Sequence, residues 1–487
     1  MTSREALAVA VIALPALAMM LLLLAPTGSV PRLARLAAVP TAVLALALTV
    51  LALRAPGQPV VGEWLVVDVA GALLVGVIGI VGLASVLVSP AYLDTGTDSL
   101  VSRQRRQRTY YASLYGFWAI LLAVPLVGNL GAAWLLVEAT TAASALLVGF
   151  SGHARALEAG WKYLVLTSLG LGVALLGIVM LAAGVPSGGL GGLSWHALST
   201  YSGGSETALV AYLLLLAGLA AKIGWAPVHN WLPDAHSEAP PPVSALLSAA
   251  LLPTVLLVAW RSQHALAPVV GEQTTRTVLI VFGLTSLGVA VPFLWRSLPW
   301  KRLLAYSSLE HIGVIALGIG FGTPLALAGV AIHIAAHAVA KALGFYAATP
   351  LLSHDPRAGE HAVTGIGRTQ PALGATMGIS LAALSGLPPS PLFVSEVLIV
   401  TGGFQAGHPW AASATALLLA LGFLGLAHAL IDTTAGDSPP RGRGAVAGLR
   451  GVTALTCVSV VLLLGLAAAA VALPGSDLAD ALVRGLS

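Results

Sequence analysis

The sequence predicts an all-α protein that crosses a membrane many times. Of its 487 residues, 57% are hydrophobic and only 9% are charged, and the mean hydropathy is +0.93. A water-soluble domain of this size cannot cover its surface with so few charged side chains. The apolar segments are rich in alanine, leucine, valine and glycine and do not alternate with a period of two. They therefore predict helices rather than barrel strands.

Fourteen apolar segments are long enough to cross a membrane. The first follows Arg4 and is long for the apolar part of a signal peptide, so we interpret it as a retained span. The predicted spans are residues 5–25, 33–53, 65–89, 110–126, 131–150, 160–184, 207–231, 243–260, 277–295, 303–320, 324–349, 371–401, 410–431 and 451–473.

Basic residues predict the orientation of these spans. Of the 23 lysines and arginines, 16 follow or flank odd-numbered spans, 5 lie on the opposite side, and Lys222 and Lys341 lie inside spans. Positive charge gathers on the cytoplasmic side of a membrane protein, so both termini are expected outside an inner (plasma) membrane. The same distribution explains the net charge of +4 without a nucleic-acid partner.

The sequence shows no pattern for a cofactor or a catalytic site of its own. The single cysteine, Cys457, excludes both a disulfide framework and a cysteine-ligated iron–sulfur centre. No phosphate-binding loop, dinucleotide fingerprint or nucleophile elbow occurs in a credible context. We therefore expect no bound cofactor, no metal and no catalytic residue in this chain.

Two ionisable residues inside predicted spans are candidates for a proton pathway. Glu138 lies in the fifth span, and Lys222 lies in the seventh, just before Gly224 and Pro227 break the helix. Charged groups in hydrocarbon are costly and usually mark an ion or proton route. We predict that the two form an ion pair whose proton can be exchanged. The alternatives are a structural carboxylate that holds two helices together and a lysine that reaches the membrane surface.

The second half of the chain repeats this arrangement. Its twelfth span is interrupted by Gly386 and three prolines, and Glu396 follows a little over one helical turn later. His333, His337 and Lys341 share one face of the eleventh span. Two histidines at this spacing can bind zinc, but the glutamate of HExxH is absent and no third ligand is evident. A polar stripe that relays protons is favoured, with inert helix packing as the alternative.

Two further groups are ambiguous. Glu310 and His311 are predicted near the cytoplasmic start of the tenth span, either as part of the relay or as a solvated pair. The other group follows the broken seventh span. It is predicted to be either a site of proton uptake or a solvated, turn-forming loop. This group comprises His229, Asp234, His236 and Glu238.

The stretch KIGWAPVHNWLPDAHSEAPPPVSALLS, residues 222–248, resembles the signature of a known family. The family comprises the antiporter-like subunits of respiratory complex I, Mrp-type antiporters and membrane-bound hydrogenases. The segments EAGWKYLVLTSLGLGVALLG and YSSLEHIGVIALGIGFG look most similar to hydrogenase-4 component F and formate hydrogenlyase-type membrane subunits. The resemblance covers nearly the whole chain.

The resemblance implies two inverted five-helix repeats, in which spans seven and twelve are equivalent. The implied regions are 1–109, with three helices and a basic cytoplasmic loop; 110–262 and 274–432, the two repeats; and 433–487, a loop and the last helix. The matching positions imply a proton pathway through Glu138, Lys222, His311, His333, His337, Lys341 and Glu396. The eighth-span lysine of complex I members is replaced by Pro253. The polar stripe of the eleventh span, formed by His333, His337 and Lys341, is therefore expected to substitute for that lysine.

The sequence thus predicts a proton-translocating membrane subunit of a redox complex that is hydrogenase-like or NADH-quinone oxidoreductase-like. The chain would carry no redox site, and its partners would be other membrane subunits and peripheral iron–sulfur, possibly nickel–iron hydrogenase-like, subunits. One alternative is an Mrp-type sodium/proton antiporter subunit. The other is an inert membrane anchor of such a complex.

Overall fold

The computed structural model describes residues 3–55, 60–62, 64–94, 100–185, 190–437 and 448–472. Three arginines that contribute to the predicted orientation lie outside these ranges, namely Arg441, Arg443 and Arg484.

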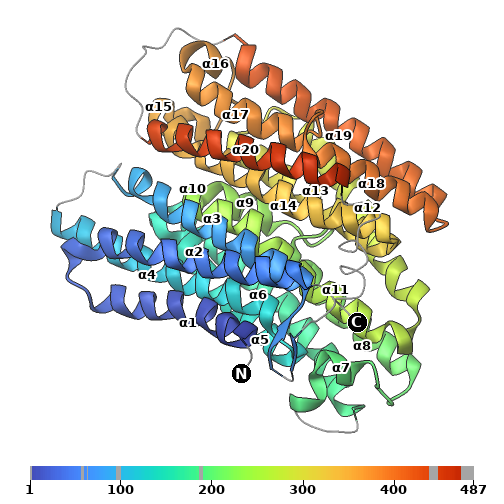
Figure 1. The fold of residues 1–487 in the computed structure, drawn as a ribbon. Helices are drawn as coiled ribbons and strands as arrows, with labels where there is room; N and C mark the ends of the chain where they lie inside the picture. Colours follow the sequence, from blue (N-terminus) through green and yellow to red (C-terminus); the bar gives the residue numbers. More distant parts are fainter. Residues whose placement is uncertain are drawn as a thin grey trace.

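The described chain is a bundle of helices that run roughly along one direction (Figure 1). A two-residue antiparallel hairpin of β1 (Val60–Val61) and β2 (Val66–Val67) joins α2 to α3. In the first half the helices are α1 (Ser3–Leu24), α2 (Val30–Arg54), α3 (Val69–Leu93), α4 (Leu100–Ala123), α5 (Leu130–Val148), α6 (Ala154–Ala183), α7 (Trp195–Leu198), α8 (Ser205–Ile223), α9 (Trp231–Glu238), α10 (Pro241–Leu246) and α11 (Leu252–Val270). In the second half they are α12 (Glu272–Leu294), α13 (Trp300–Phe321), α14 (Pro324–Tyr346), α15 (Ala348–His354), α16 (Ile366–Thr369), α17 (Pro371–Leu384), α18 (Pro391–Gln405), α19 (Pro409–Ala435) and α20 (Leu449–Ala472).

Within the described ranges, 13 helices are long and apolar enough to cross a membrane. They correspond to every predicted span except the twelfth, which is formed by the two shorter apolar helices α17 and α18. The prediction of an all-α, multi-pass membrane protein is confirmed.

Burial divides the helices into an inner and an outer set. The most apolar stretches of α13 and of the span built from α10 and α11 are completely buried, whereas those of α19 and α20 are only 22% buried. Lipid is as apolar as a leucine side chain, so an outer helix can leave its apolar face uncovered in a membrane. The inner helices are therefore the place where polar side chains are shielded from lipid.

The two predicted interruptions are present. The helix α8 ends at Ile223, directly after Lys222, and Gly224 follows with φ 79°, a left-handed conformation that favours glycine. The helices α17 and α18 are separated by a segment in which Gly386 has φ 71°. Each break therefore places a short non-helical segment beside an ionisable side chain, Lys222 in one case and Glu396 in the other.

Neighbour relations recur in the two halves of the chain. The helix α6 packs against α5 and α8, and α14 packs against α13 and α18. This is the pairing expected if the fifth, sixth and seventh spans correspond to the tenth, eleventh and twelfth. The exact repeat boundaries, 110–262 and 274–432, stay a prediction.

Some segments predicted as loops are helical. The basic run at residues 103–108 lies inside α4, which begins at Leu100, instead of in a loop. Residues 95–99 lie outside the described ranges. Lys301, predicted to flank a span on the cytoplasmic side, is buried and donates to the carbonyl oxygens of Ser237 and Ala239 at the end of α9. A lysine can cap a helix C-terminus in this way because the last carbonyls have no partner within the helix.

A buried ion pair joins α3 to α11. Asp68 caps the N-terminus of α3 by accepting from the backbone amide of Gly71 at 2.6 Å, and Arg261 donates to its other carboxylate oxygen at 2.7 Å. Both side chains are 4% exposed or less. No role was predicted for Asp68 from the sequence, because its partner lies 193 positions away along the chain.

We expect Asp68→Asn to destabilise the protein strongly, because it leaves the Arg261 guanidinium buried without a counter-charge. Breaking such a pair typically costs about 3–5 kcal/mol. Thermal unfolding of the detergent-solubilised protein measures the loss. The matched control is Arg155→Gln in the exposed pair with Glu360, where an effect below about 1 kcal/mol is expected. Equal destabilisation by the two variants would contradict a special role for the buried pair.

Candidate functional site

Lys222 lies at the end of α8 with its ammonium group enclosed by α5 and α6. The side chain is fully buried, and its Nζ donates to the hydroxyl of Thr141 at 2.8 Å and to the hydroxyl of Tyr163. The same nitrogen lies 4.5 Å from the centre of the Tyr163 ring. The Tyr163 hydroxyl also shares a 2.7 Å hydrogen bond with Ser144. Neutral hydroxyls and a ring face, rather than a carboxylate, solvate the lysine.

The predicted ion pair between Glu138 and Lys222 is not formed. Glu138 is half-buried on α5, and its Oε1 accepts from the Ser168 hydroxyl at 2.6 Å, while its Oε2 has no hydrogen-bond partner. Thr141, which contacts Lys222, lies three residues after Glu138 and so on the same face of α5 about one turn away. The two charges therefore interact across a turn of helix without direct contact. The sequence places Glu138 and Thr141 on one face of a helix, but it does not show which of the two contacts Lys222.

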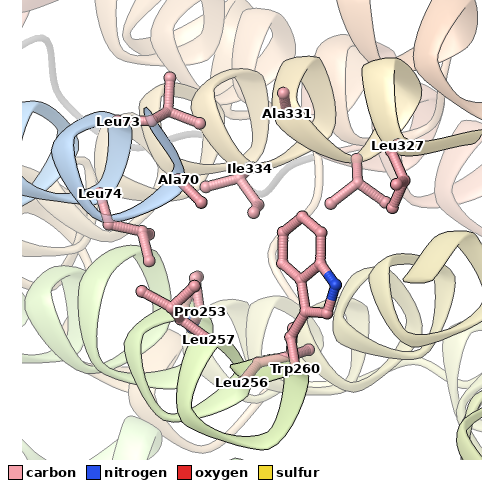
Figure 2. A pocket seen from close by; sticks show the side chains of 11 residues that line it. Ala70, Leu73, Leu74, Pro253, Leu256, Leu257, Trp260, Leu327, Ala331 and Ile334 are labelled. Atoms are coloured by element: carbon pink, nitrogen blue, oxygen red, sulfur yellow. The ribbon is translucent and has the colours of Figure 1, made fainter. Parts of the chain in front are cut away.

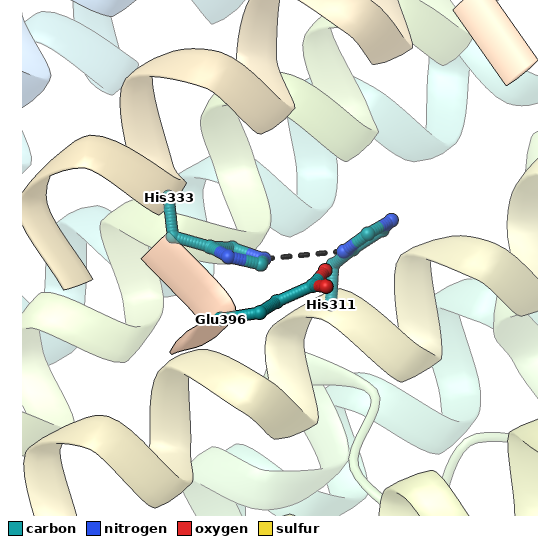
Figure 3. A group of neighbouring side chains, drawn as sticks. All are labelled: His311, His333 and Glu396. Atoms are coloured by element: carbon teal, nitrogen blue, oxygen red, sulfur yellow. Dashed lines mark hydrogen bonds between the residues drawn. The ribbon is translucent and has the colours of Figure 1, made fainter. Parts of the chain in front are cut away.

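Three buried histidines gather between α13, α14 and α18. His311 Nδ1 and His333 Nε2 are 3.1 Å apart (Figure 3). His333 Nδ1 is 2.9 Å from the Ser395 hydroxyl. The Ser395 hydroxyl itself donates to the Leu392 carbonyl at 2.7 Å, so it accepts from His333. In neutral rings this pattern leaves the lone pair of His333 on Nε2, where it accepts from His311 Nδ1. His337 lies 5.2 Å from His311 between ring centres.

Several nitrogens of this cluster have no hydrogen-bond partner among the described residues. They are His311 Nε2, both ring nitrogens of His337 and both ring nitrogens of His236. Buried polar atoms are normally paired, and unpaired ones often mark a place where a proton, a water molecule or an ion binds.

A carboxylate and an ammonium group, those of Glu310 and Lys341, lie near the histidines and interact with one another. Lys341 is fully buried on α14 and donates to the Leu304 carbonyl at 2.7 Å. Glu310 on α13 interacts with Lys341, and its Oε1 rests against Gly422 of α19, where a β-carbon would come within 2.0 Å. A β-carbon at this position would force the Glu310 carboxylate to move.

Glu396 folds back over the break in the twelfth span. A β-carbon at Gly386 would lie 2.7 Å from its Oε2. A carboxylate oxygen of Glu396 lies within 4.8 Å of ring nitrogens of His311 and His333, and Figure 3 shows the carboxylate beside these rings. The structure therefore brings together four of the predicted residues, His311, His333, His337 and Glu396, with Lys341 on the same helix as two of them.

Two interpretations of polar residues as solvated are wrong. Glu310 and His311 are 3% and 1% exposed, because α13 begins at Trp300 and places them in its middle. His236 is completely buried between the rings of Trp231 and Phe345, rather than in a solvated loop. The other members of that group fit the solvated interpretation better, since Asp234 pairs with Arg302 and Lys162 while partly exposed.

His236 is a buried ionisable residue between the surroundings of Lys222 and those of Lys341. The Trp231 ring lies 4.7 Å from the Tyr163 ring beside Lys222, and 6.4 Å from the His236 ring. On its other side His236 interacts electrostatically with Lys341 and His337. The local sequence gave no sign of this burial, because the helix α9, WLPDAHSE, also carries Asp234, Ser237 and Glu238.

Pro253 does not contribute a polar position to this axis. It lines an apolar pocket between α3, α11 and α14 together with Ala70, Leu74 and Leu257 (Figure 2). A polar contact of the eighth span is made instead by the hydroxyl of Ser248, which is 2.7 Å from that of Ser308 in α13. Ser248 lies in η5 (Leu247–Leu251), a π-helical turn, and such turns often occur at functional sites.

Fold and site together define a multi-pass membrane protein with an internal line of ionisable side chains. Residues 127–422, more than half of the chain, match the family described as NADH:quinone oxidoreductase/Mrp antiporter, transmembrane. The chain belongs to this family.

Individual relatives agree with this assignment. The chain is 31% identical over 392 residues to the hydrogenase-4 component F homolog of Methylacidiphilum infernorum, covering 78% of this chain and 81% of the relative. Its fold is similar to a chain of an archaeal membrane-bound sulfane sulfur reductase, with a TM-score of 0.86, 19% identity and coverage of 98% and 97% of the two chains. It is also similar to a chain of the Mrp complex from Dietzia sp., with a TM-score of 0.80, 19% identity and coverage of 100% and 98%.

We expect Gly422→Ala to displace the Glu310 carboxylate, because the new methyl group would overlap with Oε1. The overpacking should cost about 1–3 kcal/mol in a thermal unfolding measurement and shift the infrared carboxyl band of Glu310. The control is Gly288→Ala in α12, where a β-carbon meets nothing within 4 Å. Unchanged stability and an unchanged carboxyl band in Gly422→Ala would show that Glu310 does not occupy this position.

Proposed function

We propose that this chain is the proton-translocating membrane subunit of a multi-subunit redox complex. One observation carries the proposal: a row of buried ionisable side chains crosses the centre of the molecule. Its buried members are Lys222, His236, Lys341, His337, His311 and His333, and it ends at Glu396, which is partly exposed. Ionisable groups inside a membrane protein are expensive to bury and are rarely retained without a role in transport.

The side chains of this row are suited to transferring protons rather than sodium ions. Each imidazole can accept a proton at one nitrogen and release another from the second, and the His311–His333 contact joins two rings in this manner. Ordered water can bridge the longer separations between neighbouring residues. Sodium prefers several oxygen ligands, whereas nitrogen atoms dominate here.

The driving force would act at the Lys222 end. Glu138 is half-buried at the side of the bundle, so a change in a neighbouring subunit can reach it, and it lies one helical turn from the contacts of Lys222. Weaker attraction between Glu138 and Lys222 would favour the neutral amine and release its proton. We infer that this proton moves along the row toward Glu396.

The redox part of the proposal draws on the relatives. The name of the Methylacidiphilum infernorum relative refers to a hydrogenase, and one similar structure is that of a sulfane sulfur reductase. By this analogy, electrons and cofactors would belong to partner subunits of the iron–sulfur or nickel–iron hydrogenase-like kind. The distribution of basic residues supports a plasma-membrane location with both termini outside.

The partner subunits can be identified by mass spectrometry of the proteins that copurify with this chain in mild detergent. The proposal predicts at least one iron–sulfur subunit together with further membrane subunits. A preparation that retains several membrane subunits but no redox protein would contradict the redox assignment and favour an antiporter.

We expect Lys222→Ala to reduce redox-driven proton translocation by about tenfold or more, because the first proton-exchanging group is removed. Acidification or alkalinisation inside proteoliposomes that contain the whole complex measures the change, and native gel electrophoresis checks assembly. Lys162→Ala is the control, since Lys162 is a lysine at the partly exposed start of α6. Wild-type translocation in a fully assembled Lys222→Ala complex would refute the proposal.

An Mrp-type sodium/proton antiporter subunit is the second candidate, supported by the family description and by the similarity to the Dietzia complex. The two candidates differ in their need for an electron donor. For the redox pump, we expect a sodium gradient alone to produce no pH change in vesicles that contain the complex. A sodium-dependent pH change without any donor, lost in Lys222→Ala, would establish the antiporter instead.

A further inference from the structure

We propose that His311, His333 and Glu396 form a binding site for a transition-metal dication such as Zn²⁺. The three residues come from three different helices, and one ligand atom from each lies within 4.8 Å of the other two (Figure 3). The sequence pattern pointed to His333 and His337 and lacked a third ligand. The fold supplies a different set, in which only His333 is retained.

The separations suit a tetrahedral ion. Ligand atoms about 2.1 Å from zinc in tetrahedral geometry are about 3.4 Å apart. His311 Nδ1 and His333 Nε2 are 3.1 Å apart, so the ion can replace the proton between them with little movement of either ring. The Glu396 oxygen, now within 4.8 Å of both nitrogens, must approach by about 1.4 Å at most, and a glutamate side chain can do so by rotation about its χ angles. Two imidazoles and one carboxylate leave a fourth position for water, as in many zinc enzymes.

The surroundings of His333 resemble those of a metal ligand. A ligating histidine normally donates its second ring N–H to an acceptor that holds the ring in place. His333 Nδ1 donates to Ser395, whose own proton is directed to the Leu392 carbonyl. This arrangement keeps the lone pair of Nε2 directed at His311 and at the proposed ion.

The local charge also accommodates a cation. Glu310 and Glu396 interact with one another, and Lys341 is the ammonium group that interacts with Glu310. An ion held by Glu396 would therefore be opposed by one positive charge and attracted by two carboxylates. Imidazole ligands favour zinc, copper, nickel and cobalt over sodium, magnesium and calcium.

Binding is testable with Co²⁺ and Zn²⁺ on the purified complex, without measuring turnover. We expect one Co²⁺ per copy of this chain, a visible absorption band typical of tetrahedral cobalt, and displacement of the cobalt by Zn²⁺. His333→Asn and Glu396→Gln should abolish the band. Ser395→Ala, which removes only the group that orients His333, should weaken the affinity by about 10–100-fold.

The controls separate this site from other histidines. His337→Asn should leave the cobalt band unchanged, since His337 is adjacent but outside the ligand set. His428→Asn removes the exposed pair with Asp432 and should also have no effect. The proposal is overturned if the wild type shows no saturable binding, or if His333→Asn and Ser395→Ala bind Co²⁺ like the wild type.

A second measurement links the site to the proposed function while keeping the two separable. A metal on His333 Nε2 occupies the lone pair that the proton relay would use, so Zn²⁺ should inhibit proton translocation at the concentrations at which it binds. Binding without inhibition would confirm the metal site and contradict the relay through these histidines. In Ser395→Ala, which keeps His333, the inhibition should require about 10–100-fold more Zn²⁺. Inhibition of this variant at the wild-type Zn²⁺ concentration would contradict inhibition through this site.

Discussion

The structure depends on the cost of holding charge inside hydrocarbon. Lys222, Lys341 and the four buried histidines lie in the inner helices, where no lipid reaches them, and both lysines donate to neutral oxygen atoms. Hydroxyl and carbonyl partners stabilise an ammonium group without fixing its charge as tightly as a contacting carboxylate would. We infer that this arrangement leaves the protonation of each lysine adjustable, which a proton carrier needs and an inert anchor does not.

Much of the architecture follows from local sequence. Long apolar segments predict the spans, and the glycines and prolines after Lys222 and before Glu396 predict the two breaks, because their backbone preferences act within a few residues. The clustering of candidate residues was partly predictable too. His333, His337 and Lys341 share a face of α14 through helical periodicity alone.

The remaining features depend on contacts between distant segments. Ser168 rather than Lys222 binds Glu138, and the burial of Glu310, His311 and His236 depends on neighbouring helices that periodicity does not identify. Two members of the proposed metal site, His311 and Glu396, were hidden for the same reason, since they come from helices other than that of His333. A single sequence predicts which face of a helix is polar, but not which turn meets its partner.

Glu396→Gln tests the central claim most directly, because it removes one exchangeable proton and keeps the shape of the side chain. The quantity to measure is the number of protons translocated per electron, in proteoliposomes that contain the intact complex with its natural donor. A proton pathway ending at Glu396 predicts that electron transfer continues while this ratio falls. An unchanged ratio in the assembled variant would show that protons do not pass through Glu396.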